Sequence, residues 1–232
     1  PLTAHPKSSL ALHHPDWLLR TVRGRPVSPG LISGFIARAL DPAHPGVQAH
    51  IRGLVREAVH EWGYNYLKLD FMYAGALAGQ RYNARVTRAQ ALRQVFQVIR
   101  EAAGDDAYIV GCGAPLQTAI GLVDAMRIGP DTAPSWEPSY GSVGRLLKRN
   151  PSLPGLRNSL RNVVTRTWMH NRWWTNDPDT LLMRSTQTQL TEDEVIAQAT
   201  LIGLSGGLLL LSDKLDALTP ENERPVVLVR EL

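Results

Sequence analysis

Apolar positions recur at helical spacing along much of the chain. Between Val47 and Trp62 they form one stripe that Gly63 follows, which predicts a helix ending at this glycine. A second stripe begins after Thr87, a residue that suits the N-cap position of a helix. The predicted helices cover residues 47–62, 88–103, 156–170 and 191–204, and a last one begins after Thr219 and Pro220.

Short apolar runs between these helices predict five β-strands. They cover residues 64–71, 107–112, 125–128, 173–175 and 208–212. Strands that alternate with helices indicate a parallel sheet with helices on its outside. Each run ends in polar residues, and functional groups at the carboxyl ends of strands are typical of a (β/α)8 barrel. We therefore predict an α/β fold, a TIM-type barrel that is incomplete in this chain and holds about its last five strands.

Two segments lack such a pattern. Residues 1–45 are rich in proline and histidine and contain several turn signals, which predicts a long loop with a short ordered piece around residues 17–19. A polar stretch that reaches Pro154 precedes the helix predicted at 156–170.

The composition is ordinary for a globular protein, with 44% hydrophobic and 20% charged residues among 232. The net charge is +4, and the basic residues are spread along the chain, so we expect no nucleic-acid partner. Cys112 is the only cysteine, which excludes an intrachain disulfide. The longest apolar run, 201–211, is too short for a membrane span, and no secretory leader follows Pro1. We expect a cytoplasmic protein without membrane contact.

Lys68 and Asp70 stand on the same face of the strand predicted at 64–71, because side chains alternate along a strand. This strand is otherwise aromatic and aliphatic, so we expect it to be buried. Burying two charged side chains is costly unless they are paired or functional. Two explanations stay open at this point, a functional site or an ion pair at a sheet edge.

A second carboxylate, Asp131, follows the strand at 125–128 in a Gly-Pro-Asp turn. Two facing carboxylates suit glycoside hydrolysis, in which one is the nucleophile and the other the general acid and base. The cations Lys68 and Arg127 can keep a carboxylate ionised and can hydrogen-bond sugar hydroxyls. Four aromatic residues could offer flat faces to a sugar ring: Trp17, Tyr73, Trp136 and Trp174.

Four motifs in order along the chain resemble those of the α-galactosidases (melibiases) of glycoside hydrolase family thirty-six. Residues 66–71 (Tyr-Leu-Lys-Leu-Asp-Phe) resemble the nucleophile strand of that family, and residues 127–134 (Arg-Ile-Gly-Pro-Asp-Thr-Ala-Pro) resemble its acid/base motif. Residues 111–115 (Gly-Cys-Gly-Ala-Pro) and 176–179 (Asn-Asp-Pro-Asp) match a strand between the two and a later loop. The resemblance runs from residue 14 onward.

The resemblance implies a role for each candidate residue. Asp70 would be the nucleophile and Asp131 the acid/base, while Lys68, Cys112 and Arg127 would line the galactose subsite. The reaction would be double-displacement hydrolysis of terminal α-D-galactosyl groups of melibiose- or raffinose-type oligosaccharides, with retention and without a metal or organic cofactor. In retaining enzymes the two carboxyl groups lie about 5–5.5 Å apart.

The resemblance also implies a longer protein. The family has an N-terminal β-domain, a complete barrel and a C-terminal β-domain, so residues 1–232 would be a catalytic-barrel fragment without the first barrel strands and both β-domains. We expect this fragment to be inactive alone. α-N-Acetylgalactosaminidase action, galactosyl transfer and a non-catalytic sugar-binding remnant remain alternatives.

Other residues with reactive side chains have simpler explanations. Cys112 has no clear histidine partner, which favours a small buried or sugar-contacting residue over a thiol nucleophile. Asn176, Asp177 and Asp179 could suggest a metal site, but they lack calcium-loop spacing, so we expect a loop that braces the site. We expect His170 to be structural.

Overall fold

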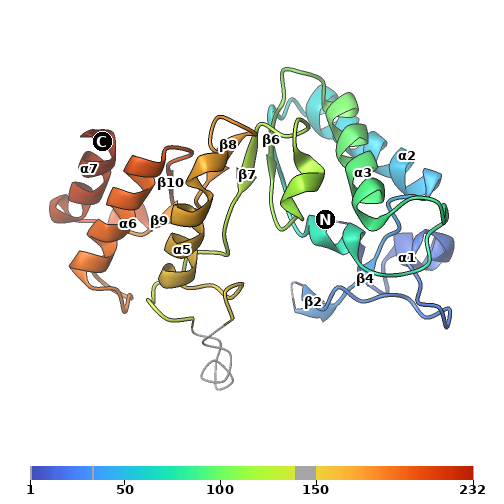
Figure 1. Ribbon diagram of the computed structural model, residues 1–232, viewed down its shortest axis with the longest axis horizontal. Helices are drawn as coiled ribbons and strands as arrows, with labels where there is room; N and C mark the ends of the chain where they lie inside the picture. The colour runs from blue at the N-terminus through green and yellow to red at the C-terminus, as the bar shows by residue number, and fades with distance from the viewer. Residues whose placement is uncertain (1, 33, 139–149, 232) are drawn as a thin grey trace. The chain divides into compact units, whose positions relative to one another are not determined.

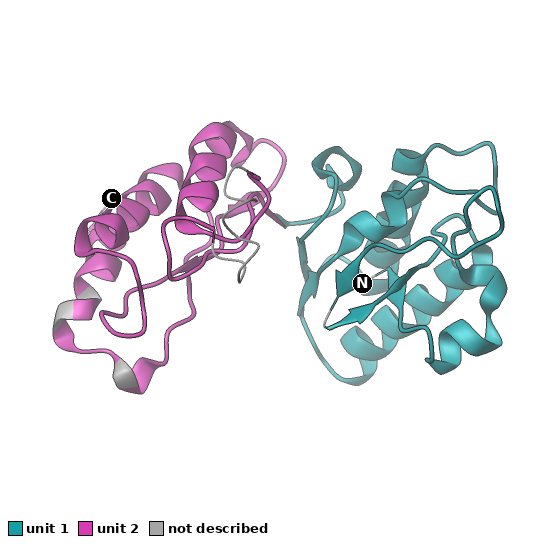
Figure 2. Cartoon of the chain, turned by 90° about the horizontal axis from the view of Figure 1, so that it is seen from below, with its two compact units in different colours: residues 1–125 teal, residues 126–232 magenta. Residues whose placement is uncertain are grey.

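A computed structural model of the protein describes residues 2–32, 34–138 and 150–231 (Figure 1). The chain forms two compact units, residues 1–125 and 126–232, shown in different colours in Figure 2. The predicted polar stretch before Pro154 falls partly on residues 139–149, outside the described residues. Each unit is described separately below.

Unit 1 alternates short strands with two long helices. Its elements are β1 (Thr3–Ala4), α1 (Ser9–His13), the 3-10 turn Pro15–Trp17, β2 (Leu31–Ile32), β3 (Phe35–Ile36), β4 (Arg38–Ala39), α2 (Pro45–Arg56), the π-helical turn Glu57–Glu61, β5 (Tyr66–Leu69), the 3-10 turn Met72–Ala76, α3 (Arg88–Ala103), β6 (Tyr108–Gly111), the 3-10 turn Leu116–Ala119 and the start of β7 (Ala125–Arg127). The helices predicted at 47–62 and 88–103 are confirmed.

The helix α3 illustrates why these residues fold as they do. Thr87 and Gln90 form a capping box, in which each side chain accepts a hydrogen bond from the other residue's backbone N–H. The apolar stripe of α3 is fully buried, with Leu92 and Val95 at 0% exposure. The helix ends at Gly104, whose φ of 78° is readily available only to glycine.

The strand that carries the first candidate residues pairs in parallel with β6. Tyr66 lies opposite Tyr108, Leu69 lies opposite Gly111, and the Tyr66 and Tyr108 rings stack. The expectation that this strand is buried is wrong, because Tyr66 is 47% exposed and Lys68 is exposed as well. Among the described strands β5 pairs with β6 along one edge, whereas each strand of a closed barrel has a neighbour on both sides.

The first 45 residues are more ordered than predicted. β1 pairs with β4 and β2 with β3, both antiparallel. Trp17 packs on a small apolar cluster that includes Leu18 and Leu40, and its indole stacks on the ring of His14. Two-residue strands carry no detectable alternation of apolar and polar positions, so tertiary pairing alone forms them.

Unit 2 follows the same alternation. Its elements are the rest of β7, α5 (Leu156–Arg166), the 3-10 turn Thr167–Met169, β8 (Thr175–Asp177), β9 (Thr180–Leu181), α6 (Glu192–Ser205), β10 (Leu210–Leu211), the 3-10 turns Leu215–Ala217 and Pro220–Glu223, and α7 (Arg224–Glu231). The strand β7 is a hydrogen-bonded neighbour of β8, and β9 pairs in parallel with β10.

Most predicted elements of unit 2 are confirmed, with shifted ends. A capping box formed by Thr191 and Glu194 opens α6. The strand predicted at 173–175 instead covers Thr175–Asp177, and Trp174 just before it forms an isolated bridge with His170. The prediction missed β9, whose partner β10 lies about thirty residues further along the chain.

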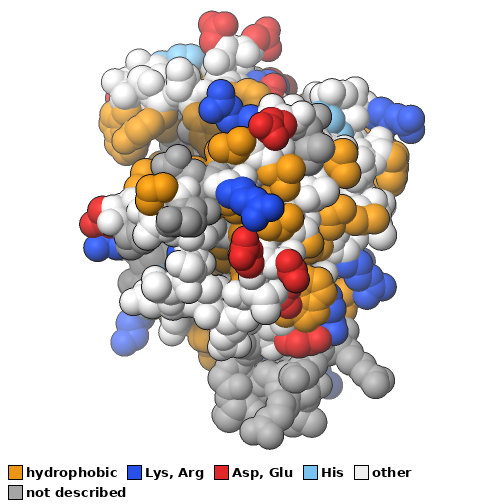
Figure 3. Space-filling model, turned by 90° about the vertical axis from the view of Figure 1, so that its left-hand side faces the viewer, with side chains coloured by type: hydrophobic (Ala, Val, Ile, Leu, Met, Phe, Trp, Pro, Cys, Tyr) orange, Lys and Arg blue, Asp and Glu red, His pale blue; other side chains and the backbone are white. Residues whose placement is uncertain are grey.

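In the described residues no helix is both long and apolar enough to cross a membrane. On the face drawn in Figure 3, Lys and Arg side chains are interspersed with Asp and Glu. Elsewhere in the structure opposite charges also pair, as Arg224 and Glu192 do in an exposed ion pair at 3.3 Å. The small positive net charge is therefore not gathered into a patch on this face.

Candidate active site

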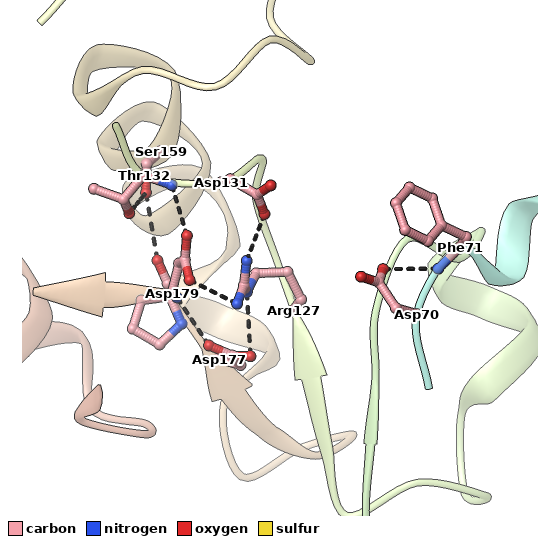
Figure 4. A network of polar contacts seen from close by, with 9 residues as sticks. Asp70, Phe71, Arg127, Asp131, Thr132, Ser159, Asp177 and Asp179 are labelled. Carbon is pink, nitrogen blue, oxygen red and sulfur yellow. Dashed lines mark hydrogen bonds and ion pairs between the residues drawn. The ribbon is translucent and has the colours of Figure 1, made fainter. Parts of the chain in front are cut away.

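Asp70 follows β5 directly and is partly buried in unit 1. Its Oδ1 accepts a hydrogen bond of 2.7 Å from the backbone N–H of Phe71 (Figure 4). Phe71 has a φ of 54°, a left-handed conformation that costs a bulky residue free energy. This hydrogen bond fixes the direction of the Asp70 carboxylate, as the position of a nucleophile requires.

The loop after β6 holds the loop that carries Asp70. The Cys112 N–H donates to the Leu69 carbonyl at 2.7 Å, and the Tyr73 N–H donates to the Gly113 carbonyl at 2.6 Å. Cys112 is 6% exposed, in line with a small buried residue. The motif at 111–115 therefore supports the nucleophile strand through its backbone.

Tyr73 is the aromatic candidate nearest in the chain to Asp70, and its hydroxyl donates to the Pro29 carbonyl at 2.8 Å. Burial raises the pKa of the Tyr73 phenol above its usual value of 10.0, and the negative charge of Asp70 raises it further. The folded protein therefore favours the neutral form of the Tyr73 phenol.

Lys68 is exposed, and in the part of the chain that the structure describes no ion pair joins it to Asp70. The sheet-edge ion pair that the sequence left open is therefore not formed. Lys68 is available to other partners, as its predicted role in sugar binding requires.

Arg127 is the centre of a buried charge cluster at the end of β7 in unit 2 (Figure 4). Its side chain is 4% exposed and contacts three carboxylates. The distances are 3.0 Å from Nη1 to Asp131 Oδ1, 3.1 Å from Nε to Asp177 Oδ2, and 2.6 Å from Nη2 to Asp179 Oδ1. The structure thus brings the predicted residues Arg127 and Asp131 together.

The loop at 176–179 braces this cluster, as the sequence predicted. Asp177 and Asp179 have side chains that are 1% and 9% exposed, and both contact Arg127. Burial raises the pKa of Asp179 above its usual value, while the Arg127 charge and a hydrogen bond from the Thr132 N–H act in the opposite direction. Sequence reasoning did not identify these two partners of Arg127, because they lie about fifty positions further along the chain.

Asp131 differs from the other carboxylates of the cluster because its side chain is 72% exposed. Its backbone carbonyl accepts a hydrogen bond of 3.1 Å from the Gly155 N–H, at the start of α5. Asp131 is therefore anchored at the backbone and at one carboxylate oxygen, while the rest of the carboxylate can reach a solute. A group in this position can exchange a proton with a bound molecule.

Two of the aromatic candidates and His170 have structural roles. Trp174 is 5% exposed and bonded to Asn176, so it lies in the core, and Trp17 packs against His14. The Asn176 N–H donates to Nδ1 of His170 at 3.2 Å, the structural role expected for this histidine. Of the four aromatic candidates, Tyr73 and the 36% exposed Trp136 can still contact a sugar.

Among the described residues no group of three or more His, Cys, Asp or Glu side chains is arranged to hold a metal ion. Two open cavities, of 510 and 660 Å³, lie away from the candidate residues. The first is lined by α6, α7 and the segment 183–185, and the second by residues 79–88. Neither cavity is lined by Asp70 or Asp131, so neither is the candidate site.

Comparison with solved structures shows a close likeness over nearly the whole chain. One similar structure is the α-galactosidase TtGalA from Thermus thermophilus, solved in complex with p-nitrophenyl α-D-galactopyranoside. It is 37% identical to this chain and has a TM-score of 0.84, over 99% of this chain and 45% of that chain. For its complex with stachyose the identity is 36% and the TM-score 0.85, over 98% of this chain and 48% of that chain.

The chain is similar to this α-galactosidase over nearly its whole length. This confirms the resemblance that the four motifs indicated, although no model of a known protein family matches the chain. The chain spans about half the length of TtGalA.

A more distant α-galactosidase has the same fold. The enzyme I from Mortierella vinacea is 14% identical, with a TM-score of 0.52 over 74% of this chain and 43% of that chain. The fold of part of a TIM-type barrel is therefore supported, with parallel strands and alternating helices as predicted. The roles of Lys68, Asp70, Cys112, Arg127 and Asp131 stay predictions.

Proposed function

We propose that the protein is a retaining α-galactosidase that removes terminal α-D-galactosyl groups from oligosaccharides. The observation that carries the proposal is the 37% identity to TtGalA across 99% of the chain. TtGalA has been solved with an aryl α-galactoside and with stachyose, which motivates oligosaccharides of this kind as the substrate here.

In the proposed first step, an Asp70 oxygen attacks the anomeric carbon and forms a β-galactosyl ester. Asp131 donates its proton to the glycosidic oxygen, and the bond to the leaving group breaks. In the second step Asp131 accepts a proton from water, the water oxygen attacks the anomeric carbon, and Asp70 leaves as a carboxylate. Two inversions restore the α configuration of galactose.

The local geometry of each aspartate supports its role. The N–H of Phe71 donates to Asp70 Oδ1 and fixes the direction of this carboxylate, which suits a nucleophile. Asp131 is held by Arg127 yet exposed, which suits a group that exchanges a proton with the leaving oxygen and then with water. The separation of about 5–5.5 Å between the two carboxyl groups stays a prediction. So do the cytoplasmic location and the β-domains on either side.

Incubating the complete gene product with p-nitrophenyl α-D-galactopyranoside tests this proposal. We expect release of p-nitrophenol, and proton NMR should show α-galactose as the first-formed sugar before mutarotation. First-formed β-galactose would contradict the retaining mechanism. Turnover of the β-galactoside or the N-acetylgalactosaminide in place of the α-galactoside would contradict the proposed substrate.

A further inference from the structure

Asp179 holds the segment that carries Asp131 from both sides. One carboxylate oxygen of Asp179 lies 2.6 Å from Arg127 Nη2, four positions before Asp131. The other accepts a hydrogen bond of 2.6 Å from the backbone N–H of Thr132, directly after Asp131 (Figure 4). A single buried carboxylate thus bridges the two ends of the turn.

The Asp131 side chain depends on this bridge for its direction. It is 72% exposed, and among the described residues its side chain pairs with Arg127 Nη1 at 3.0 Å. Arg127 is in turn fixed by Asp177 and Asp179, which contact its two other nitrogens. Displacing Arg127 or Thr132 would therefore turn the Asp131 carboxylate.

The conformation of Asp179 shows that this arrangement is costly. Its φ is 75°, in the left-handed region that a residue other than glycine rarely adopts. Its backbone N–H donates to Asp177 Oδ1 at 2.8 Å, and its side chain is almost fully buried. Strained and desolvated groups of this kind persist where the surrounding contacts require them, often at functional sites.

We propose that Asp179 is a positioning residue that aims the Asp131 carboxylate at the leaving-group oxygen. The inference rests on the proposed function, because it assigns Asp179 a task in the acid-catalysed step. Asp179 acts through Arg127 and the Thr132 backbone and does not touch the substrate. Its loss should therefore harm protonation of the leaving group more than attack by Asp70.

Leaving groups of different acidity separate these two effects. p-Nitrophenolate departs with little protonation, whereas the sugar alcohol of melibiose needs the acid catalyst. General acid catalysis contributes roughly 10²- to 10⁴-fold to such rates, so partial misplacement should cost on the order of tenfold. In Asp179→Asn we expect kcat/KM to fall at least about tenfold more for melibiose than for the p-nitrophenyl galactoside.

Asp124 provides a matched control in unit 1. Its carboxylate also accepts hydrogen bonds from an arginine and from a backbone N–H, namely Arg100 Nη2 at 2.5 Å and the Ile109 N–H at 2.7 Å. Asp124 precedes β7, whereas Asp179 follows the strand β8. In Asp124→Asn any loss through misfolding should be equal for the two substrates. An equal loss in Asp179→Asn, or a selective loss in Asp124→Asn, would overturn the proposal.

Two further measurements keep the inference testable if the first is blocked. If Asp179→Asn does not fold, Asp177→Asn removes a contact to Arg127 without touching Thr132, and it should give a smaller loss with the same preference for melibiose. If the wild-type protein hydrolyses neither substrate, the proposed function fails. A crystal structure of Asp179→Asn then decides, because an Arg127–Asp131 contact kept at its original geometry would refute the positioning role.

Discussion

At the scale of single residues, Arg127 shares its guanidinium among three carboxylates, and this sharing explains how Asp177 and Asp179 can be buried. Each of the two would be costly to bury without a partner. Their contacts to Arg127 are at 3.1 and 2.6 Å, so the guanidinium compensates carboxylate charge that is buried away from water. Asp131 uses the remaining nitrogen and stays exposed.

Replacing Arg127 by methionine should therefore destabilise the protein strongly. The change leaves Asp177 and Asp179 buried without a cation, and removing one partner of a buried ion pair costs about 3–5 kcal/mol. Urea unfolding followed by tryptophan fluorescence measures the loss. The control Arg52→Ala breaks the exposed pair with Glu101 at 3.1 Å and should cost less than about 1 kcal/mol. Equal losses in the two variants would contradict the account of the cluster.

Tyr73 makes stability depend on pH in the alkaline range. Burial and the Asp70 charge raise its pKa above 10.0, so the folded state favours the neutral phenol more than the unfolded state does. This contribution is fully present below pH 10.0 and is lost as the pH rises through the raised pKa. Tyr73→Phe should unfold at a temperature that falls less over that range. A parallel fall in wild type and variant would contradict the burial of the phenol next to Asp70.

At the scale of elements, the loop after β6 controls the conformation of the loop after β5. Gly113 has a φ of 55°, and a Cβ added there would lie 3.2 Å from the Phe71 nitrogen and 3.4 Å from Asp70 Oδ1. Gly121 has a φ of 76° as well, yet a Cβ there would meet nothing within 4 Å. The two glycines have a similar backbone conformation and differ in their neighbours.

Gly113→Ala should therefore lower activity out of proportion to stability. Both Gly113→Ala and Gly121→Ala incur a left-handed backbone cost of roughly 1–2 kcal/mol. The first also crowds the backbone nitrogen of Phe71, which donates to Asp70, and small displacements of a reacting group cost on the order of tenfold or more in rate. Thermal unfolding and kcat/KM of the two variants, measured side by side, check this. If kcat/KM falls equally in both, the contact with Asp70 has no catalytic consequence.

The elements that the sequence predicted are those whose signals are local. The stripes and capping boxes of α3 and α6 lie within one helix each, and both helices were predicted nearly to the residue. The strand β9 and the antiparallel pair of β1 and β4 depend on partners far along the chain. Their own residues show no periodic pattern that would predict a strand. The exposure of β5 was missed for a similar reason, since burial depends on neighbouring strands.

The candidate site was predictable to a different degree at each position. Asp70, Asp131 and the bracing loop at 176–179 were found through motifs. The partnership of Arg127 with Asp179 and the left-handed backbone of Phe71 were not, because ion pairs between distant residues and dihedral angles leave no trace in local composition. Trp17 and Trp174 were candidates for sugar contact, but Trp17 stacks on His14 and Trp174 is buried in the core.

At the scale of the whole molecule, each compact unit supplies one of the two candidate carboxylates. Asp70 belongs to unit 1 and Asp131 to unit 2. The chain spans about half the length of TtGalA, so activity has to be measured on the complete gene product. The central claim is that Asp70 forms the covalent bond to galactose.

Azide rescue of Asp70→Ala tests that claim most directly. The variant should lose turnover of p-nitrophenyl α-D-galactopyranoside, because no nucleophile remains. Azide fits the space left by the carboxylate and should attack the anomeric carbon from the same side, so NMR should identify β-galactosyl azide as the product. Turnover that survives the substitution, or an α-configured galactosyl azide, would contradict the assignment of Asp70 as the nucleophile.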